Sequence, residues 1–569
     1  MTVVRRFFAV ICALSAMTLA AQTRPTQTPA PTPTPQVAPT TEPVTAAVTA
    51  DTDKDLTNPR ALRLSLDDAL KTSVERNIGI SLERYTFLEA GESLRGSYGI
   101  YDWLATADLQ HQNNRTPTTS QFAPSGSRAN IWDFGISQLI PTGGSYTIGF
   151  NNSRVNQTGG GTFINPSYRS SLTAGLTQPL LRNFGVDVTS RGIYIARNTL
   201  GINHEAFRGV IMDTAVTAEQ VYLDLVYARQ FVDVVKEGLF LARDQARITQ
   251  IRIDVGASAP LDILQPRVQI ATEEQALIAA VASVRDAEDR LRAVMHLDPG
   301  DWDRPLIPTT PAAYTPVTID QEQAVTQAIQ NRPEMHEQIL TTANRQITYI
   351  YARNQALPRV DLNLNYSAAG IAGAVIDPTT GMVVSSSGYS RAVNQVFGND
   401  FPSYTFGVTV GLPITNIAAR AEAKRAEYDV ALQRTNEEQT RQNIALDVRG
   451  AARAIDTAAK EITASRTARE AAEQNVEAER RRYENGLSTN FQVLQIQQQL
   501  TQARASEIQA LVGYNKALAA YHRAIGDLLD VANIRIDEPV VNEPHIFGRF
   551  LEGYNWLNYG SRIQQPQPQ

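Results

Sequence analysis

Six segments of the chain alternate apolar residues with Ser, Thr, Gly, Asn or Asp, which is the pattern of amphipathic β-strands. A half-buried sheet of a soluble protein gives this alternation, and so does a lipid-exposed barrel with a wet lumen. Six such segments in a chain with little else to cover them favour the barrel. The predicted strands are 103–110, 132–137, 145–151, 172–177, 360–366 and 403–412.

Heptad spacing predicts long helices in both halves of the chain. A helix from about Glu205 to Asp254 would be ~75 Å long at 1.5 Å per residue, which exceeds an ordinary globular core. The apolar heptad positions of each helix form a seam, and such a seam needs a partner helix to cover it. A soluble coiled coil would give the same pattern. The two seams consist of Leu225, Ala228, Val232, Val235, Leu239, Ala242 and Ala246, and of Ile444, Val448, Ala451, Ile455, Ala458 and Ile462.

The predicted elements occur twice, in the order helix, strands, long helix, break, long helix. Leu64–Leu70 matches Ile319–Val325 at an offset of 255 residues. Gly256–Gln265 matches Gly486–Gln495 at an offset of 230 residues, so the first copy is 25 residues longer. A repeat of this length indicates duplicated domains and not a short-repeat solenoid.

The additional residues of the first copy coincide with the segment 131–155. Its strands alternate and are joined by the tight turn Pro141–Gly144. We therefore expect an added hairpin, which gives six strands per chain. Long polar stretches rich in Gly, Ser and Thr at 115–128, 156–167 and 368–402 predict external loops.

The amino terminus has the features of a secretory signal peptide over residues 1–21. Arg5 and Arg6 precede the apolar segment Phe7–Leu19, and Ala20 and Ala21 offer a cleavage site of small residues. A buried N-terminal helix is the alternative. Residues 22–58 form a Thr/Pro-rich linker that we expect to be disordered, because it cannot bury enough apolar surface.

The remainder divides into two repeats and two connecting segments. The first repeat covers 59–297, with its strands at about 103–178, and a proline-rich linker follows at 298–318. The second repeat covers 319–530, with its strands at about 359–412. Residues 531–569 are less periodic and end in a Gln/Pro run, which predicts a C-terminal segment followed by a tail.

Composition excludes several classes of protein. The formal net charge of -6 gives no indication of a nucleic-acid partner, because proteins that bind nucleic acid usually carry a basic patch. The only cysteine, Cys12, lies inside the predicted signal peptide, so no disulfide framework is expected. After residue 21 no uncharged apolar run approaches the ~20 residues of a spanning helix.

Motifs for catalysis, cofactors and metals are not found in the sequence. His204 and Glu205 begin like a zinc-protease helix, but the second His is missing at the required spacing. His336 and Glu337 have no partner in sequence either, and the glycines at 159–161 lack the Lys-Ser/Thr of a phosphate loop. We therefore predict no enzyme activity, no cofactor and no metal site.

The chain resembles the TolC-type outer-membrane efflux family over roughly residues 60–530. No single motif is specific for this family, but two copies of the motifs in the right order are specific. The resemblance rests on Leu66–Leu70, on Asp320–Val325 with Asn331-Arg332-Pro333, on Gln178–Leu181, and above all on the repeated Val255-Gly256 with Asp262-Ile263-Leu264 and Asn485-Gly486 with Val493-Leu494.

The resemblance implies an α+β membrane protein of the cell outer membrane. Three protomers would share one β-barrel, continuous with a long periplasmic α-helical coiled-coil barrel. This would close the open edges that a few strands per chain leave, which lipid does not tolerate. Three chains of six strands would supply 18 barrel strands, or 12 if the added hairpin lies outside the barrel.

The function implied by the resemblance is passive. The trimer would be the exit duct of a tripartite efflux pump or a type I secretion system, exporting solutes or polypeptides. Its partners would be two further copies of the chain, outer-membrane lipid, a periplasmic adaptor (membrane fusion protein) and the inner-membrane transporter that supplies the energy. The segment 298–318 and the C-terminal segment would form a belt around the helical barrel.

The resemblance also assigns residues at the two helix breaks. Tyr483 matches a position whose side-chain contacts help to close the entrance, whereas local capping of a helix is the alternative for Asp262. The predicted periplasmic gate consists of Asp262, Tyr483, Gln492 and Gln495. The predicted adaptor docking tips consist of Val255, Gly256, Ala257, Asn485, Gly486 and Leu487.

Two other functions fit parts of the pattern. A periplasmic adaptor also has helical hairpins, but usually one hairpin flanked by other modules, and a structural envelope coiled coil would explain the seams alone. Neither accounts for two copies that both carry amphipathic strands. The sequence does not identify the exported substrate or the inner-membrane pump.

Overall fold

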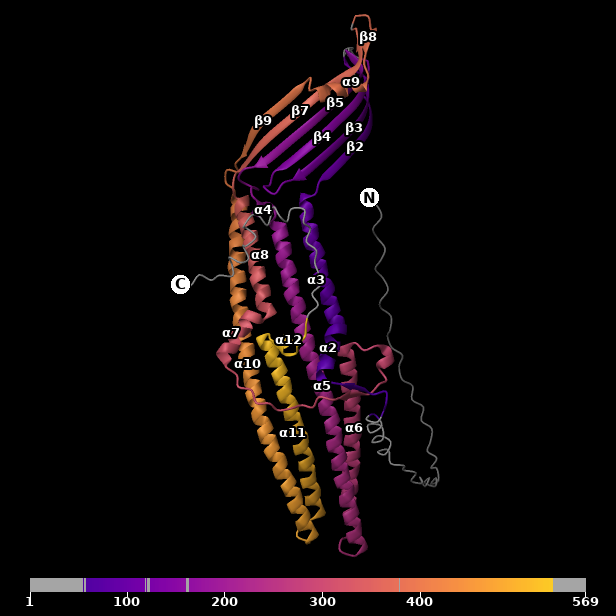
Figure 1. Cartoon of the computed structure of the whole chain (residues 1–569), viewed down its shortest axis with the longest axis vertical. Helices are drawn as coiled ribbons and strands as arrows, with labels where there is room; N and C mark the ends of the chain where they lie inside the picture. Colours follow the sequence, from indigo (N-terminus) through magenta and orange to yellow (C-terminus); the bar gives the residue numbers. More distant parts are fainter. Residues whose placement is uncertain are drawn as a thin grey trace, which may run out of the picture.

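A computed structural model shows the arrangement of the duplicated elements. It describes residue 55 and residues 58–535, except 118, 120–122, 160–162 and 378. The predicted signal peptide, most of the predicted linker at 22–58 and the C-terminal residues from 536 lie outside the described residues. The chain is elongated, with one sheet at one end and two helical hairpins reaching the other end (Figure 1).

Two very long helices run along most of this length. The helices are α2 (Leu66–Arg76), α3 (Ile78–Ser97), α4 (Val186–Thr189), α5 (Arg191–Asp254), α6 (Leu264–Met295), α7 (Gln321–Asn331), α8 (Pro333–Gln355), α9 (Tyr389–Gly398), α10 (Ile417–Glu484), α11 (Asn490–Ile525) and α12 (Leu528–Val531). Helix α5 has 64 residues and α10 has 68, so each is roughly 100 Å long.

The predicted start of the first long helix at about Glu205 is wrong, because α5 begins at Arg191. Its first part packs against α3 and α8, whereas its later part pairs with α6 and α11. A surface shared between several helices does not produce the simple heptad seam that indicates a two-helix contact. The sequence pattern therefore identified only the part that has a coiled-coil partner.

The heptad seams lie in two separate cores. Most of the first seam is buried between α5 and α6, and most of the second between α10 and α11. Ala246 and Ala451 are only partly buried, and their places in the cores are taken by neighbours such as Gln245 and Ala452. Helices α5 and α11 also contact each other, so the two hairpins stand side by side (Figure 1).

Six long strands and one short strand form a single antiparallel sheet. The strands are β2 (Leu104–Arg115), β3 (Gly126–Leu139), β4 (Ser145–Thr158), β5 (Ile164–Pro179), β7 (Arg359–Ile376), β8 (Val383–Ser386) and β9 (Pro402–Gly411). Their order is β2-β3-β4-β5-β7, with β9 and the short β8 also paired to β7. The two edges of the sheet are thus β2 and β9.

The predicted hairpin is confirmed, and it lies inside the sheet. Strands β3 and β4 pair without interruption from Gly126 opposite Thr158 to Leu139 opposite Ser145. They separate β2 from β5, so the hairpin is not an appendage.

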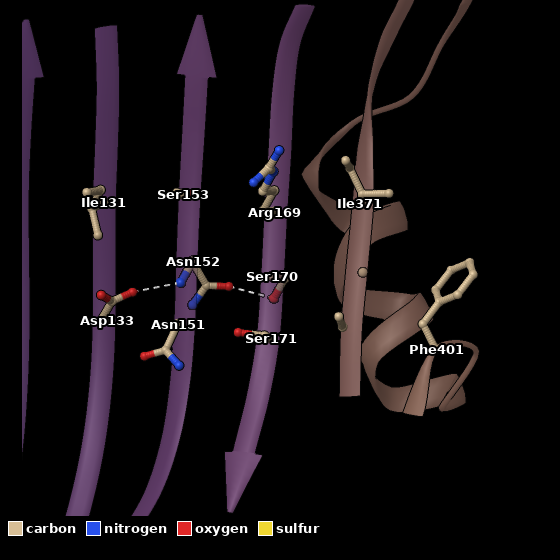
Figure 2. Close-up of a pocket in the computed structure, with 12 residues that line it drawn as sticks. Ile131, Asp133, Asn151, Asn152, Ser153, Arg169, Ser170, Ser171, Ile371 and Phe401 are labelled. Atoms are coloured by element: carbon tan, nitrogen blue, oxygen red, sulfur yellow. Dashed lines mark hydrogen bonds between the residues drawn. The ribbon is translucent and has the colours of Figure 1, made fainter. Parts of the chain in front are cut away.

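Register divides the sheet into an apolar and a polar face. On the apolar face Phe134 lies opposite Phe150, which lies opposite Leu172. On the polar face Asp133 lies opposite Asn151, which lies opposite Ser171. Figure 2 shows a hollow lined largely by this polar face, next to hydrogen bonds that join Asp133, Asn152 and Ser170 across three strands.

The predicted external loop at 368–402 is largely wrong. Strand β7 continues to Ile376, and β8 and α9 follow within the segment. Helix α9 packs on β7 and β5, and a Cβ at Gly370 would lie only 2.0 Å from the Ala392 carbonyl oxygen. Small residues gave this segment a loop-like composition, but their function is to let a helix approach the strand closely.

The predicted linker between the repeats is anchored at the middle of the molecule. Its strand β6 (Leu306–Pro308) pairs in parallel with β1 (Leu62–Leu64). The fully buried carboxylate of Glu288 accepts a hydrogen bond from the Leu306 backbone at 3.1 Å and pairs with Arg229 at 2.7 Å and Arg292 at 3.2 Å. These contacts tie β6 to both helices of the first hairpin.

Within the described residues, every helix is too short or too polar to cross a membrane.

Candidate functional site at the hairpin tips

The two helix breaks lie where the sequence predicts them, and they have the same geometry. Helix α5 ends at Asp254 and α10 ends at Glu484. Two residues beyond each end, Gly256 has φ +75° and Gly486 has φ +73°. Glycine is favoured there because an L-residue with a side chain is strained in the left-handed region.

Matching hydrogen bonds close both turns. The amides of Gly256 and Ala257 donate to the carbonyls of Ile253 and Arg252 at 3.0 and 2.7 Å. The corresponding amides of the second tip, at Gly486 and Leu487, donate at 3.0 and 2.8 Å. Each helix thus ends in the paired-bond glycine cap that satisfies its last carbonyl groups.

The surface of both tips is apolar and exposed. Val255 is 72% exposed and Leu487 is 80% exposed. Leu261 and Phe491, on the return side of each turn, are exposed as well. A Cβ at either tip glycine would meet no atom within 4 Å, so no residue that the structure describes covers the turns.

Tyr483 forms a contact between the two hairpins near their tips. Its ring is buried beneath the Arg252 guanidinium, whose central carbon lies 4.3 Å from the ring centroid. Arg252 Nη2 also donates to the carbonyls of Tyr483 and Glu484 at 2.8 and 3.1 Å. A cation at the C-terminal end of α10 is favourable for the helix dipole as well as for the ring.

Arg252 was not predicted from the sequence. It lies four residues before Gly256, just as Arg482 lies four residues before Gly486. Arg482 pairs with Glu479 on its own helix at 3.3 Å and is well exposed. The duplication therefore marks the position of the arginine, but not which copy reaches across to the other hairpin.

Asp262 makes the local capping contact that was the alternative to a gate, and Gln492 makes the equivalent contact in the second copy. Asp262 Oδ2 accepts from the Ala259 amide at 3.0 Å. At the equivalent place in the second copy, Gln492 Oε1 accepts from the Thr489 amide at 3.3 Å and from Ser488 Oγ at 2.9 Å. Both side chains are exposed, and each is held by its own turn.

The structure does not bring the four predicted gate residues into one cluster. Gln495 is exposed on α11, one turn beyond Gln492. Asp262 is linked to the second tip only through its carbonyl oxygen, which accepts from Asn490 Nδ2 at 3.3 Å. Asn490 in turn accepts from Gln245 Nε2 at 2.8 Å, in a contact that is buried between the hairpins.

Polar groups continue along the contact between the hairpins above the tips. Arg504 on α11 pairs with Glu237 on α5 and with Glu473 on α10, the latter at 3.0 Å. Burial raises the pKa of Glu273, although a hydrogen bond from Gln269 opposes this. No group of His, Cys, Asp and Glu in the described part of the chain is arranged to hold a metal ion.

The fold and its tips define a class of protein: a channel built from an amphipathic sheet with two open edges and from paired helical hairpins. Residues 143–295 and 324–527, more than half of the chain, match the family described as outer membrane efflux protein. The chain belongs to this family. It is an outer-membrane efflux channel with a periplasmic helical domain, and the family is not enzymatic.

Individual relatives agree with this assignment. The chain is 25% identical over 429 residues to the outer membrane efflux protein BepC of Brucella suis biovar 1 (strain 1330), over 74% of this chain and 85% of BepC. CusC has a similar fold, with a TM-score of 0.59 at 15% identity over 82% of this chain and 94% of CusC. The CmeC outer membrane channel of Campylobacter jejuni gives a TM-score of 0.59 at 14% identity, over 84% of this chain and 87% of CmeC.

The family assignment excludes the two alternatives, a periplasmic adaptor and a purely structural coiled coil. Channels of this family form trimers.

We predict that Arg252→Leu separates the two hairpin tips. The substitution removes the guanidinium from the Tyr483 ring and from two carbonyls, contacts that together contribute about 1–3 kcal/mol. Spin labels on cysteines at Val255 and Leu487, in protein diluted with unlabelled chains, should give a broader and longer distance distribution. Arg482→Leu is the matched control and should leave the distance distribution unchanged. Equal effects of the two substitutions would contradict the assignment of Arg252 as the residue that joins the two tips.

Proposed function

We propose that three copies of this chain form a passive exit duct for a tripartite efflux pump. The observation that carries the proposal is the pair of open edges: every residue of β2 and nearly every residue of β9 is exposed in the single chain. Lipid cannot satisfy unpaired backbone groups, so β2 of one copy pairs with β9 of the next. Three sheets of six long strands give an 18-stranded barrel.

Directions and faces suit this closure. Strand β2 begins next to the helices and β9 ends next to them, so neighbouring copies meet as antiparallel strands. The face with Phe134 and Phe150 then contacts lipid, and the face with Asp133 and Asn151 lines the lumen. The helical hairpins of the three copies continue the wall of the duct into the periplasm.

The hairpin tips are the docking surface for a periplasmic adaptor, which connects the duct to an inner-membrane transporter. Exposed apolar residues at both turns, including Val255 and Leu487, provide a contact area that is left uncovered by the described part of the chain. The glycines keep the turns narrow, so that a partner can approach the backbone closely. Energy for transport comes from the inner-membrane partner.

The same tips form the periplasmic gate. Arg252 and Tyr483 hold the two hairpins of each copy together, and loss of this contact opens the entrance. Asp262 of three copies forms a ring of carboxylates, which attracts cations and repels anions. Gln492 and Gln495 place neutral amides near this ring, so selectivity for cations is weaker than at an entrance with several acidic rings.

Closure of the barrel between copies can be tested by cysteine cross-linking. We expect Thr106→Cys on β2, combined in turn with cysteine at Thr405, Gly407 or Thr409 on β9, to give covalently linked chains upon oxidation for at least one pair. All four positions belong to the polar faces of the edge strands. Thr106→Cys with Thr147→Cys on β4 is the control, because β3 lies between them. Unlinked chains throughout, with monomers on unboiled gels, would refute the trimer.

Docking can be separated from helix breaking by two substitutions at the tip glycines. We expect Gly256→Asn with Gly486→Asn to abolish export but to preserve heat-resistant trimers, because Asn tolerates the left-handed conformation and still adds bulk. The pair Gly256→Ala with Gly486→Ala adds little bulk but strains each turn by about 1–2 kcal/mol. Export and adaptor pull-down measure the outcome. Full export by the asparagine pair would show that the glycines serve only to end the helices.

The charge of Asp262 can be removed without removing its cap. Asp262→Asn retains an oxygen that accepts from the Ala259 amide, so the turn should persist. We expect lower cation selectivity in single-channel recordings of this variant. Gln492→Glu also retains its capping acceptor, adds a second ring of charge and should raise cation selectivity. If both variants keep the wild-type reversal potential in a salt gradient, these residues do not line the entrance.

A further inference from the structure

Three arginines occupy neighbouring strands at the end of the sheet that lies far from the helices. Arg115 ends β2, Arg128 lies near the start of β3, and Arg154 lies near the end of β4. Register places them on one face: Arg115 lies opposite Gly126, two residues before Arg128, and Arg154 lies opposite Asn130, two residues after Arg128. The three therefore form a diagonal row about 16 Å long, which crosses two interstrand spacings and runs four residues along the strands.

This row is on the apolar, lipid-facing side of the sheet. Residues at alternate positions share a face, so Arg128 lies on the same side as Trp132 and Phe134. Arg154 likewise shares its face with Phe150. All three arginines are exposed, and none of them makes an ion pair with a residue that the structure describes.

An aromatic cluster separates the arginines from the apolar band. The Arg154 guanidinium lies 5.7 Å from the centroid of the Tyr168 ring. Tyr389 lies at the start of α9. The centroid of its ring is 5.3 Å from that of the Trp132 ring and 6.4 Å from that of the Tyr168 ring. Its hydroxyl donates to Asn152 Oδ1 at 2.8 Å, which fixes α9 against the sheet.

The lipid-facing surface thus has three layers from the far end of the sheet towards the helices. The first layer is cationic, the second is aromatic, and the third consists of aliphatic and aromatic side chains. This is the sequence of layers from the headgroups to the interior of a bilayer leaflet. Arginine in the hydrocarbon layer would be destabilising, so the row lies at headgroup level. Because the helices are periplasmic, the leaflet in question is the outer one.

We propose that Arg115, Arg128 and Arg154 bind the phosphate groups of a phosphorylated glycolipid of the outer leaflet. Guanidinium groups bind phosphate oxygens with two parallel hydrogen bonds, and unpaired arginines on a membrane-facing surface lack another anion. A row about 16 Å long over three strands suits a headgroup with more than one phosphate. The acyl chains would then lie along the Trp132 and Phe134 rows. The inference rests on the proposed barrel, in which the apolar face contacts lipid, and not on adaptor docking or the gate.

Binding of purified lipid A to the detergent-solubilised full chain tests the proposal. Native mass spectrometry with bis-phosphorylated lipid A should show bound lipid, with weaker binding of the monophosphoryl form and little of phosphatidylcholine. The triple variant Arg115→Gln, Arg128→Gln, Arg154→Gln should weaken the binding of bis-phosphorylated lipid A about tenfold or more. Replacement of all three by lysine should restore part of it, since charge remains but the bidentate geometry is lost.

Arg169→Gln is the matched control. Arg169 lies opposite Ser153 and Ile371 and therefore on the polar face, next in sequence to Tyr168. It should change lipid affinity by less than about twofold, since a lumen-facing arginine does not contact lipid. Unboiled gels establish that each variant is assembled, and single Arg→Gln variants replace the triple variant if it is not.

Equal lipid affinity of the wild type and the Gln variants would overturn the proposal, as would an equal loss with Arg169→Gln. Inorganic phosphate should not displace the lipid at millimolar concentration. Displacement by inorganic phosphate would identify a site for free anions and would also overturn the assignment to a lipid.

Discussion

The unpaired edges of one sheet are the constraint on which the rest of this protein depends. The apolar face formed by residues such as Phe134 and Phe150 has to contact lipid, and lipid offers no partner for the backbone groups of β2 and β9. Additional copies of the chain solve this problem by closing the sheet. Once copies are arranged in a ring, the helical hairpins attached to the strands must also stand in a ring, and a duct follows from the same closure.

Most of this arrangement could be predicted from sequence, because alternation and heptad spacing report directly on burial. The strands, the hairpin within 131–155 and the two tip glycines lie where those patterns place them. Helix α9 was missed because its Gly- and Ser-rich surroundings have the composition of a loop, while its seat at Gly370 depends on a tertiary contact. The role of Arg252 was missed for a similar reason, since only the packing of two hairpins brings it to Tyr483.

Duplication preserved the backbone of the tips more closely than their side-chain chemistry. Asp262 and Gln492 occupy equivalent positions and cap equivalent turns, although only the aspartate carries a charge. Arg252 crosses to the other hairpin, whereas its counterpart Arg482 pairs within its own helix. A turn geometry that both copies need is thus combined with contacts that only one copy makes.

The distribution of apolar and polar contacts indicates which parts of the hairpins can separate. Within each hairpin the seam is apolar, with Leu225 and Val232 in the first and Ile455 in the second, and opening it would expose that surface to water. Between the hairpins near the tips the contacts are polar, such as that of Gln245 with Asn490. Water can replace hydrogen bonds of this kind at a net cost of only about 1 kcal/mol each, whereas it cannot replace apolar packing. The polar contacts between the hairpins are therefore easier to separate than the apolar seam within each hairpin.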